Sequence, residues 1–156
     1  KLGVVQQIGK PQEVYDDPVN LFVAKFLGTP PINVFDGEVK GGKLYIGGTA
    51  VLDAPGVADQ LVTVGIRPEG FNLDPNGPFV CNLSNLEVMG RDVSVVSTHA
   101  NSQNPVVRSI INSDSNIDAT AKTISFSLKS HKVFIFNSET EKRIYFGDQT
   151  APETGI

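Results

Sequence analysis

The stretch VKGGKLYIGGTAVLD, residues 39–53, decides the fold class of this protein. Apolar and polar side chains alternate along it with the period of two that is typical of β-strands. Glycine pairs at 41–42 and 47–48 enclose a strand of only four residues. Paired glycines favour tight turns, because glycine adopts positive φ without strain. The pattern therefore predicts short strands joined by hairpins, as at the rim of a small barrel.

Outward from this stretch, the same alternation recurs along most of the chain. The segments between are rich in Gly, Pro, Asn and Ser, as at residues 74–78, 101–104 and 113–116. Many short strands at near-regular spacing predict a mainly β fold, either a sandwich or a small closed barrel. The expected strands cover residues 34–39, 43–46, 50–52, 61–66, 79–88, 92–98, 105–111, 123–128, 133–136 and 143–145.

Composition and charge narrow the classes of function. The chain has 156 residues, of which 40% are hydrophobic and 19% charged, so it can bury a core. Its net charge is −4 and its 13 basic residues are scattered, whereas a nucleic-acid partner requires clustered Lys and Arg. No apolar run approaches the roughly 18 residues of a membrane span. We therefore expect a domain that neither binds nucleic acid nor crosses a bilayer.

The first 33 residues follow a different pattern. The chain begins at Lys1 on an apolar alternation without an initiator Met, and we expect this part to be the end of a domain whose beginning is missing. Residues 4–8 have the pattern of a strand, and Pro11 is suited to begin a single helical turn. Asn20 is expected to cap a second helix over residues 21–27, which ends before a glycine.

Two parts of the sequence resemble a known family. Residues 64–69, VGIRPE, are similar to an element of the regulatory domain in the ATPase subunits of maltose-type ABC sugar importers. The first 35 residues resemble the carboxyl end of the ATPase domain of the same subunits. The residues that carry this second resemblance are Gln7-Ile8-Gly9, Pro11, Glu13-Val14-Tyr15, Pro18, Asn20, Phe22-Val23-Ala24, Phe26-Leu27-Gly28, Pro30 and Asn33.

The resemblance implies a division of the chain into two parts. Residues 1–33 would be the remnant of an ATPase domain. Residues 34–156 would form a regulatory β-barrel with the oligonucleotide/oligosaccharide-binding fold (OB-fold), a TOBE-type domain. The implied function is regulation and dimerisation of the ATP-binding subunit of a sugar importer, on the cytoplasmic side of the cell membrane. The implied partners are a second copy of the subunit, regulatory proteins and, through the missing ATPase domain, the membrane permease subunits.

The sequence lacks the G-x-x-x-x-G-K-[S/T] loop that holds ATP phosphates and Mg²⁺. We therefore expect this chain to have no enzymatic activity and no cofactor, although the resemblance implies ATP and Mg²⁺ in the full-length subunit. No catalytic or metal-binding residues are expected either. Cys81, His99 and His131 are too few and too scattered for a zinc site, and Cys81 is expected to be a small buried side chain.

Arg67 and Glu69 are the first pair of candidate contact residues. They flank Pro68, which fixes one φ angle and biases Arg67 to extended backbone. Two interpretations are open. The pair contacts the missing ATPase body or a partner subunit, or it forms an internal ion pair that closes a corner of the barrel.

Phe22 and Phe26 are the second pair. They are four residues apart on the expected helix and therefore share one face of it. An apolar helix without its ATPase domain is a site for association, so we expect the chain to self-associate through residues 1–35. The alternative is that the helix folds back on its own barrel.

Two further questions concern the barrel. Phe134 and Phe136 share one face of their strand, so this strand is either central in a sheet or covered at an interface. The rival function is a barrel that binds a small ligand, either an oxyanion or a sugar. Oxyanion binding favours basic side chains or backbone amide groups, and the negative net charge weakens that version.

Overall fold

The structure is a computed structural model, and it describes residues 15–26, 30–112, 117–147 and 149. Within these residues the fold is mainly β. It also contains the short helix α2 (Leu21–Phe26), helical backbone at Tyr15 and Asp16, and two 3₁₀ turns, η1 (Pro68–Gly70) and η2 (Ser130–Lys132). The strand expected over residues 4–8 lies outside the described part. None of the helices in these ranges has the length and apolar character needed to span a membrane.

The first sheet has the strand order β11-β10-β4-β1-β2-β3, and every neighbouring pair is antiparallel. Its glycine-flanked β2–β3 hairpin is the one that the sequence predicts, with positive φ at Gly47 and Gly48. The strands are β1 (Asn33–Lys40), β2 (Lys43–Ile46), β3 (Thr49–Asp53), β4 (Gln60–Ile66), β10 (Val133–Asn137) and β11 (Arg143–Ile144).

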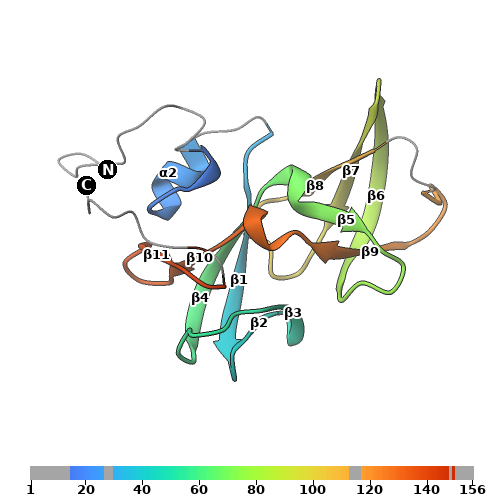
Figure 1. Ribbon diagram of the computed structural model, residues 1–156. Coiled ribbons are helices and arrows are strands. Elements are labelled where there is room, and N and C mark those ends of the chain that lie inside the picture. The colour runs from blue at the N-terminus through green and yellow to red at the C-terminus, as the bar shows by residue number, and fades with distance from the viewer. Residues whose placement is uncertain (1–14, 27–29, 113–116, 148, 150–156) are drawn as a thin grey trace.

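The second sheet has the order β5-β9-β6-β7-β8, again antiparallel throughout. Its end strands, β5 and β8, come into contact, so the sheet nearly closes into a five-stranded barrel. The OB-fold expectation is thereby confirmed. Figure 1 shows the long β6–β7 hairpin extending on the side of the molecule away from α2. The strands are β5 (Phe71–Leu73), β6 (Phe79–Met89), β7 (Asp92–Thr98), β8 (Val107–Asn112) and β9 (Thr123–Leu128).

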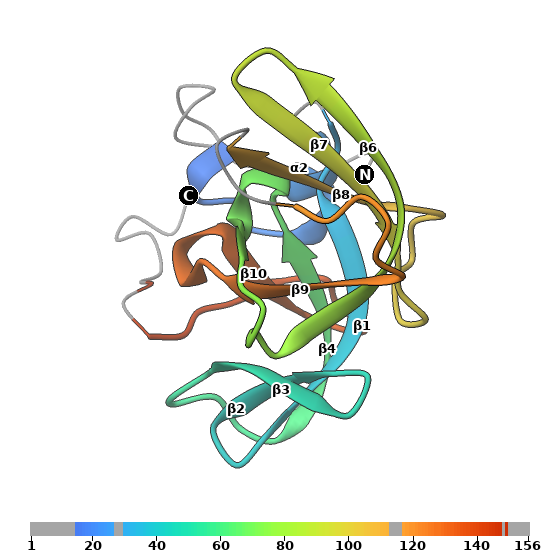
Figure 2. The same cartoon turned by 90° about the vertical axis from the view of Figure 1, so that its right-hand side faces the viewer.

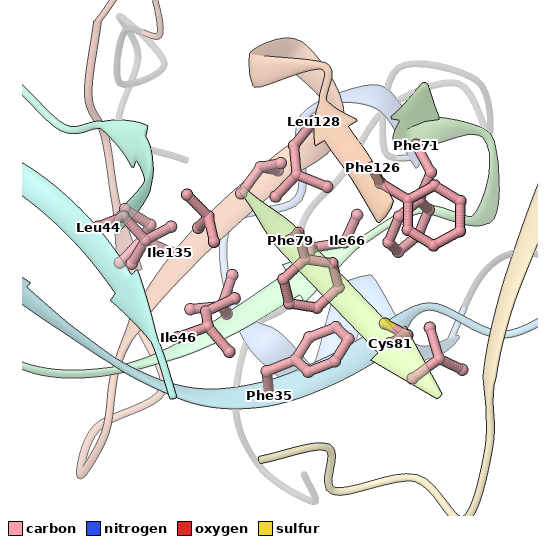
Figure 3. Close-up of a cluster of buried hydrophobic side chains, with 14 of the residues drawn as sticks. Phe35, Leu44, Ile46, Ile66, Phe71, Phe79, Cys81, Phe126, Leu128 and Ile135 are labelled. Carbon is pink, nitrogen blue, oxygen red and sulfur yellow. The ribbon is translucent and has the colours of Figure 1, made fainter. Parts of the chain in front are cut away.

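One hydrophobic core fills the space between the two sheets. Figure 3 shows Phe35, Ile66 and Phe79 converging there from different strands. Phe126 and Cys81 are also buried, as the sequence predicts. Aromatic edges meet aromatic faces in this core, which is the favoured geometry for ring pairs, as between Phe71 and Phe126 with centroids 5.0 Å apart.

A second apolar cluster lies on the opposite face of the first sheet. Leu21 and Ala24 of α2 pack there against Val34 of β1 and against Phe134 and Phe136 of β10. Ile135, which lies between these two phenylalanines on β10, points to the opposite face, into the main core. β10 is therefore central in its sheet and is also covered by the helix, as seen from two sides in Figures 1 and 2. The helix thus folds back on the two-sheet β domain, which is called the barrel below, as in the alternative that the sequence left open.

Candidate interdomain contact site

The helix α2 is held on the barrel by its own cap and by main-chain bonds. The Asn20 side-chain oxygen accepts a hydrogen bond from the Val23 N–H at 2.9 Å, which confirms Asn20 as the N-cap. The Leu21 N–H donates to the Glu141 carbonyl oxygen at 3.0 Å. The main chain that precedes the helix thus pairs with the loop between β10 and β11.

Arg67, which follows β4, binds the same segment from the side of the first sheet. It has φ −63° and ψ 148°, the extended conformation that Pro68 imposes. Its guanidinium group is fully buried and donates to two carbonyl oxygens, that of Ala24 at 2.9 Å and that of Tyr15 at 2.8 Å. The Ala24 carbonyl belongs to the last turn of α2, where carbonyl groups lack helical partners. Arg67 therefore fastens both ends of the segment to the barrel.

Tyr15 and Glu69 complete this corner. The Tyr15 ring lies 3.8 Å from the Arg67 guanidinium carbon, in a cation–π contact. Its hydroxyl donates to Glu69 Oε2 at 2.7 Å, and Lys132 Nζ lies 3.4 Å from the same oxygen. Burial opposes ionisation of Glu69, but the bonds from Tyr15 and the charge of Lys132 outweigh it and lower its pKa. Burial, then the bond to Glu69, raises the pKa of Tyr15. The corner thus holds the Tyr15 ring against the Arg67 guanidinium group and the Tyr15 hydroxyl against the Glu69 carboxylate.

Arg143 of β11 makes a second attachment. Only 8% of it is exposed. Its Nη1 donates to Asp17 Oδ1 at 2.9 Å and to the Pro18 carbonyl oxygen at 2.6 Å, while Nη2 donates to Gln149 Oε1 at 3.0 Å. Its backbone N–H donates to the Val19 carbonyl oxygen. These bonds fix the turn that joins the helical residues Tyr15 and Asp16 to α2.

Both arginines lie over the same aromatic ring. The guanidinium carbons of Arg67 and Arg143 are 5.7 Å and 4.6 Å from the centroid of Phe134. Burial lowers the pKa of each guanidinium group, but the pKa of arginine is so high that both stay charged. We call Arg67 and Arg143 the arginine anchor. It joins residues 15–24 to the barrel through three backbone carbonyl groups and one carboxylate.

The candidate residues from the sequence fall into two places. Arg67 and Glu69 come together with Tyr15 at the base of the segment that precedes the barrel. Phe22 and Phe26 lie on the outer side of α2, with 36% and 76% of each exposed, and their rings stack with centroids 6.1 Å apart. The sequence missed Arg143. Its only signal is an arginine within an otherwise apolar alternation, next to Lys142, and such pairs are usually solvated.

The described residues contain no group of three or more His, Cys, Asp or Glu that could hold a metal ion. Cys81 is buried, and burial raises the pKa of its thiol to about 11, so it is a poor nucleophile at neutral pH. His99 stacks on Phe79 with centroids 5.0 Å apart. These residues serve packing in this structure.

Comparisons with known proteins give a consistent result. Residues 33–73 match the family model described as the CysA C-terminal regulatory domain. The chain is 32% identical over 143 residues to the sn-glycerol-3-phosphate import ATP-binding protein UgpC of Ruegeria sp. (strain TM1040). The aligned region covers 91% of this chain and 40% of that protein. It is 33% identical over 150 residues to the protein of the same name from Salmonella typhimurium, with 91% and 41% covered. The chain thus spans about two fifths of the length of these curated relatives.

Proposed function

We propose that this chain is the carboxyl-terminal regulatory part of an ATP-binding subunit of an ABC importer, and that it couples the ATPase domain of that subunit to a regulatory β-barrel. The match of residues 33–73 to the CysA C-terminal regulatory domain and the similarity to the two import ATP-binding proteins support this proposal. In this proposal the chain itself hydrolyses no ATP and binds no cofactor, and ATP and Mg²⁺ act in the rest of the subunit. The work of the chain is protein contact. It stabilises a pair of subunits and receives regulatory proteins.

The arginine anchor is the observation that supports this function most directly. A flexible linker would let the barrel move independently of what precedes it. Here two buried arginines bind backbone carbonyls of the segment just before the barrel, and backbone positions do not change with side-chain rotation. Force applied to residues 15–24 would therefore reach β4 and β11 directly. That is what coupling between an ATPase domain and a regulatory domain requires.

We keep the division into residues 1–33 and 34–156 as part of the proposal. α2 belongs by sequence resemblance to the first part, yet it covers the Phe134 and Phe136 face of the second. The boundary would then lie within a rigid junction rather than in a free linker, and Arg67 and Glu69 would be its contact residues.

The cargo, the partners and the location of the subunit are also part of the proposal. The curated relatives are named for sn-glycerol 3-phosphate import, whereas the sequence motifs resemble maltose-type subunits. We propose a sugar or a phosphorylated polyol as cargo. The subunit would act with a second copy of itself and with permease subunits, on the cytoplasmic face of the membrane.

The decisive experiment substitutes Arg67→Ala in the full-length subunit that contains this chain. Loss of the guanidinium group leaves the Tyr15 and Ala24 carbonyls without their buried donor, at a cost of about 3 kcal/mol. We expect α2 to detach, seen as faster amide exchange at Leu21–Phe26, and transport-coupled ATP hydrolysis to fall several-fold.

Arg108→Ala is the matched control, because Arg108 is a 40% exposed arginine whose side chain pairs with Glu87 on the surface. It should leave both readouts near wild type. If Arg67→Ala speeds exchange in α2 while coupled ATPase activity and subunit affinity stay unchanged, the coupling role is wrong. If the variant does not fold, Arg67→Lys tests the same point, since lysine keeps the charge and loses the two-pronged geometry.

A further inference from the structure

The outer face of the first sheet is covered by α2 only in part. Beyond Val34, the outward residues of β1 are Asp36, Glu38 and Lys40, and all three are exposed. Glu38 pairs in register with Tyr45 of β2 on one side and with Leu61 of β4 on the other. Directly opposed residues point to the same face of a sheet. A carboxylate therefore lies between an aromatic ring and a leucine that is 67% exposed.

This row of side chains forms the floor of a surface groove. One part, of about 400 Å³, is lined by Asp36, Gly37, Glu38, Tyr45, Gly47, Gly48, Leu61 and Asn101. A second part, of about 500 Å³, is lined by Glu38, Lys40, Gly41, Lys43, Tyr45 and Gly48. The two parts share Glu38, Tyr45 and Gly48, so they are continuous. Volumes of this size suit small molecules.

The groove is fixed in shape on one side and open on the other. The Asp36 N–H donates to the Asn101 carbonyl oxygen at 2.9 Å, which holds the loop after β7 against β1. The Asp36 carboxylate accepts a hydrogen bond from Gln103 Nε2 at 2.9 Å. On the β2–β3 side, a Cβ at Gly48 would meet nothing within 4 Å, so this rim is open. A ligand would meet a preformed surface, which lowers the entropy cost of binding.

The groove offers acceptors at one end and donors at the other. The Glu38 carboxylate makes no hydrogen bond or ion pair with the described residues, and Asp36 keeps a second oxygen for a ligand. At the far end lie the ammonium groups of Lys40 and Lys43, and Asp53 pairs with Lys43 at 2.9 Å. Opposite charges along one groove disfavour an anion or a cation, since each would meet repulsion at one end.

We propose that this groove binds an uncharged polyhydroxylated ligand, a sugar of one or two rings. Sugar hydroxyls both donate and accept, so they match carboxylates at one end and ammonium groups at the other. The C–H face of the ring packs on Tyr45 and Leu61, and Glu38 between them accepts two neighbouring hydroxyls. The site is separate from the arginine anchor, and the inference does not depend on the proposed coupling function.

The test is a titration of the 156-residue chain, labelled with ¹⁵N, with glucose and with maltose. We expect saturable shifts at the amides of Glu38, Tyr45 and Asn101, with a Kd in the millimolar range. Glu38→Gln keeps the size of the side chain and removes its charge, and it should weaken binding about tenfold, because bonds to charged groups are worth about 1.4 kcal/mol or more. Tyr45→Leu should weaken it similarly through loss of the ring.

Glu139→Gln is the control, an acid-to-amide change at an exposed residue of the loop that joins β10 to β11, the strands at the opposite edge of the first sheet from β2 and β3. It should bind like wild type. Parallel titrations use sn-glycerol 3-phosphate as an anion and arginine methyl ester as a cation. Three results would overturn the proposal: no shifts with either sugar, equal weakening by Glu139→Gln and Glu38→Gln, or tighter binding of either charged probe than of the sugars.

Discussion

Two buried positive charges are the most demanding feature at the scale of single residues. Taking an ion out of water costs several kcal/mol unless hydrogen bonds replace the lost hydration. Arg67 meets this need with two carbonyl oxygens and a tyrosine ring, and Arg143 with a carboxylate, a carbonyl and a glutamine. Neither set is complete until residues 15–24 lie on the barrel, because only the Gln149 contact is independent of them. The anchor therefore favours the docked arrangement strongly over the undocked one.

His99 gives a prediction at the same scale. Its Nδ1 accepts the Asn101 N–H at 3.0 Å, which requires a neutral ring, and burial lowers its pKa. The unfolded chain therefore binds the proton more readily than the folded one. The contribution of His99 to the free energy of unfolding should be fully present above its pKa in the unfolded chain, about 6.5. This contribution should fall as the pH drops below that value.

The measurement is urea unfolding at several values between about pH 7 and pH 5. His99→Phe keeps a ring against Phe79 but has no titrating group, and it should flatten this dependence. His131→Phe, at an exposed histidine, is the control. A wild-type slope in the His99 variant would contradict the assignment.

At the scale of elements, α2 shows what sequence patterns reveal and what they miss. Asn20 predicted the start of the helix, since an N-cap acts within a few residues, and the pre-proline position of Arg67 marked one half of the anchor. Arg143 could not be predicted, because Asp17 and Pro18, which it binds in the segment before the barrel, lie more than a hundred residues away. The row of Glu38, Tyr45 and Leu61 could not be predicted either, because it depends on the register of three strands. β5 was missed because its three residues, Phe71–Leu73, are too few to show a period.

The cap offers a second prediction. Asn20→Ala removes the oxygen that accepts the Val23 N–H and should cost about 1 kcal/mol. Because tertiary contacts hold the other end of α2, we expect faster amide exchange at Leu21–Phe26 with little change in the barrel. Asn20→Asp preserves the acceptor and should behave like wild type. Uniformly faster exchange across both sheets would mean that the helix and barrel unfold together.

Phe22 and Phe26 lead to a third prediction, which concerns self-association of the chain. They remain exposed after α2 has docked, so among the described residues of the 1–35 segment they are the large apolar side chains open to a second copy. Phe22→Ser with Phe26→Ser should abolish self-association in light scattering and shift the melting temperature little, because neither ring packs in the second cluster. Lys25→Ser, at an exposed residue of the same helix, is the control. A wild-type chain that stays monomeric at high concentration would rule out self-association.

At the scale of the whole molecule, the first segment is a structural part of the barrel. Removing residues 1–33 would uncover Val34, Phe134 and Phe136. It would also take away the Tyr15 and Ala24 carbonyl groups that Arg67 binds and leave Arg143 without Asp17 and Pro18. Burial of each of these apolar side chains is worth roughly 1.5 to 3 kcal/mol. We therefore expect the shortened chain to be less stable and more prone to aggregate than the full one, as measured by thermal unfolding and light scattering. A shortened chain that is monomeric and equally stable would show that the segment is dispensable.

The pairing of Arg143 with Pro18 has a consequence for synthesis. The two residues are 125 positions apart, and contacts this distant in sequence form late. On the ribosome, α2 would emerge long before β10 and β11, which complete its binding surface. In the proposed full-length subunit, an ATPase domain that folds first would hold this helix unattached while more than a hundred residues are translated. Chaperone binding during that interval, and its release once β11 has emerged, would be the kinetic signature of this chain.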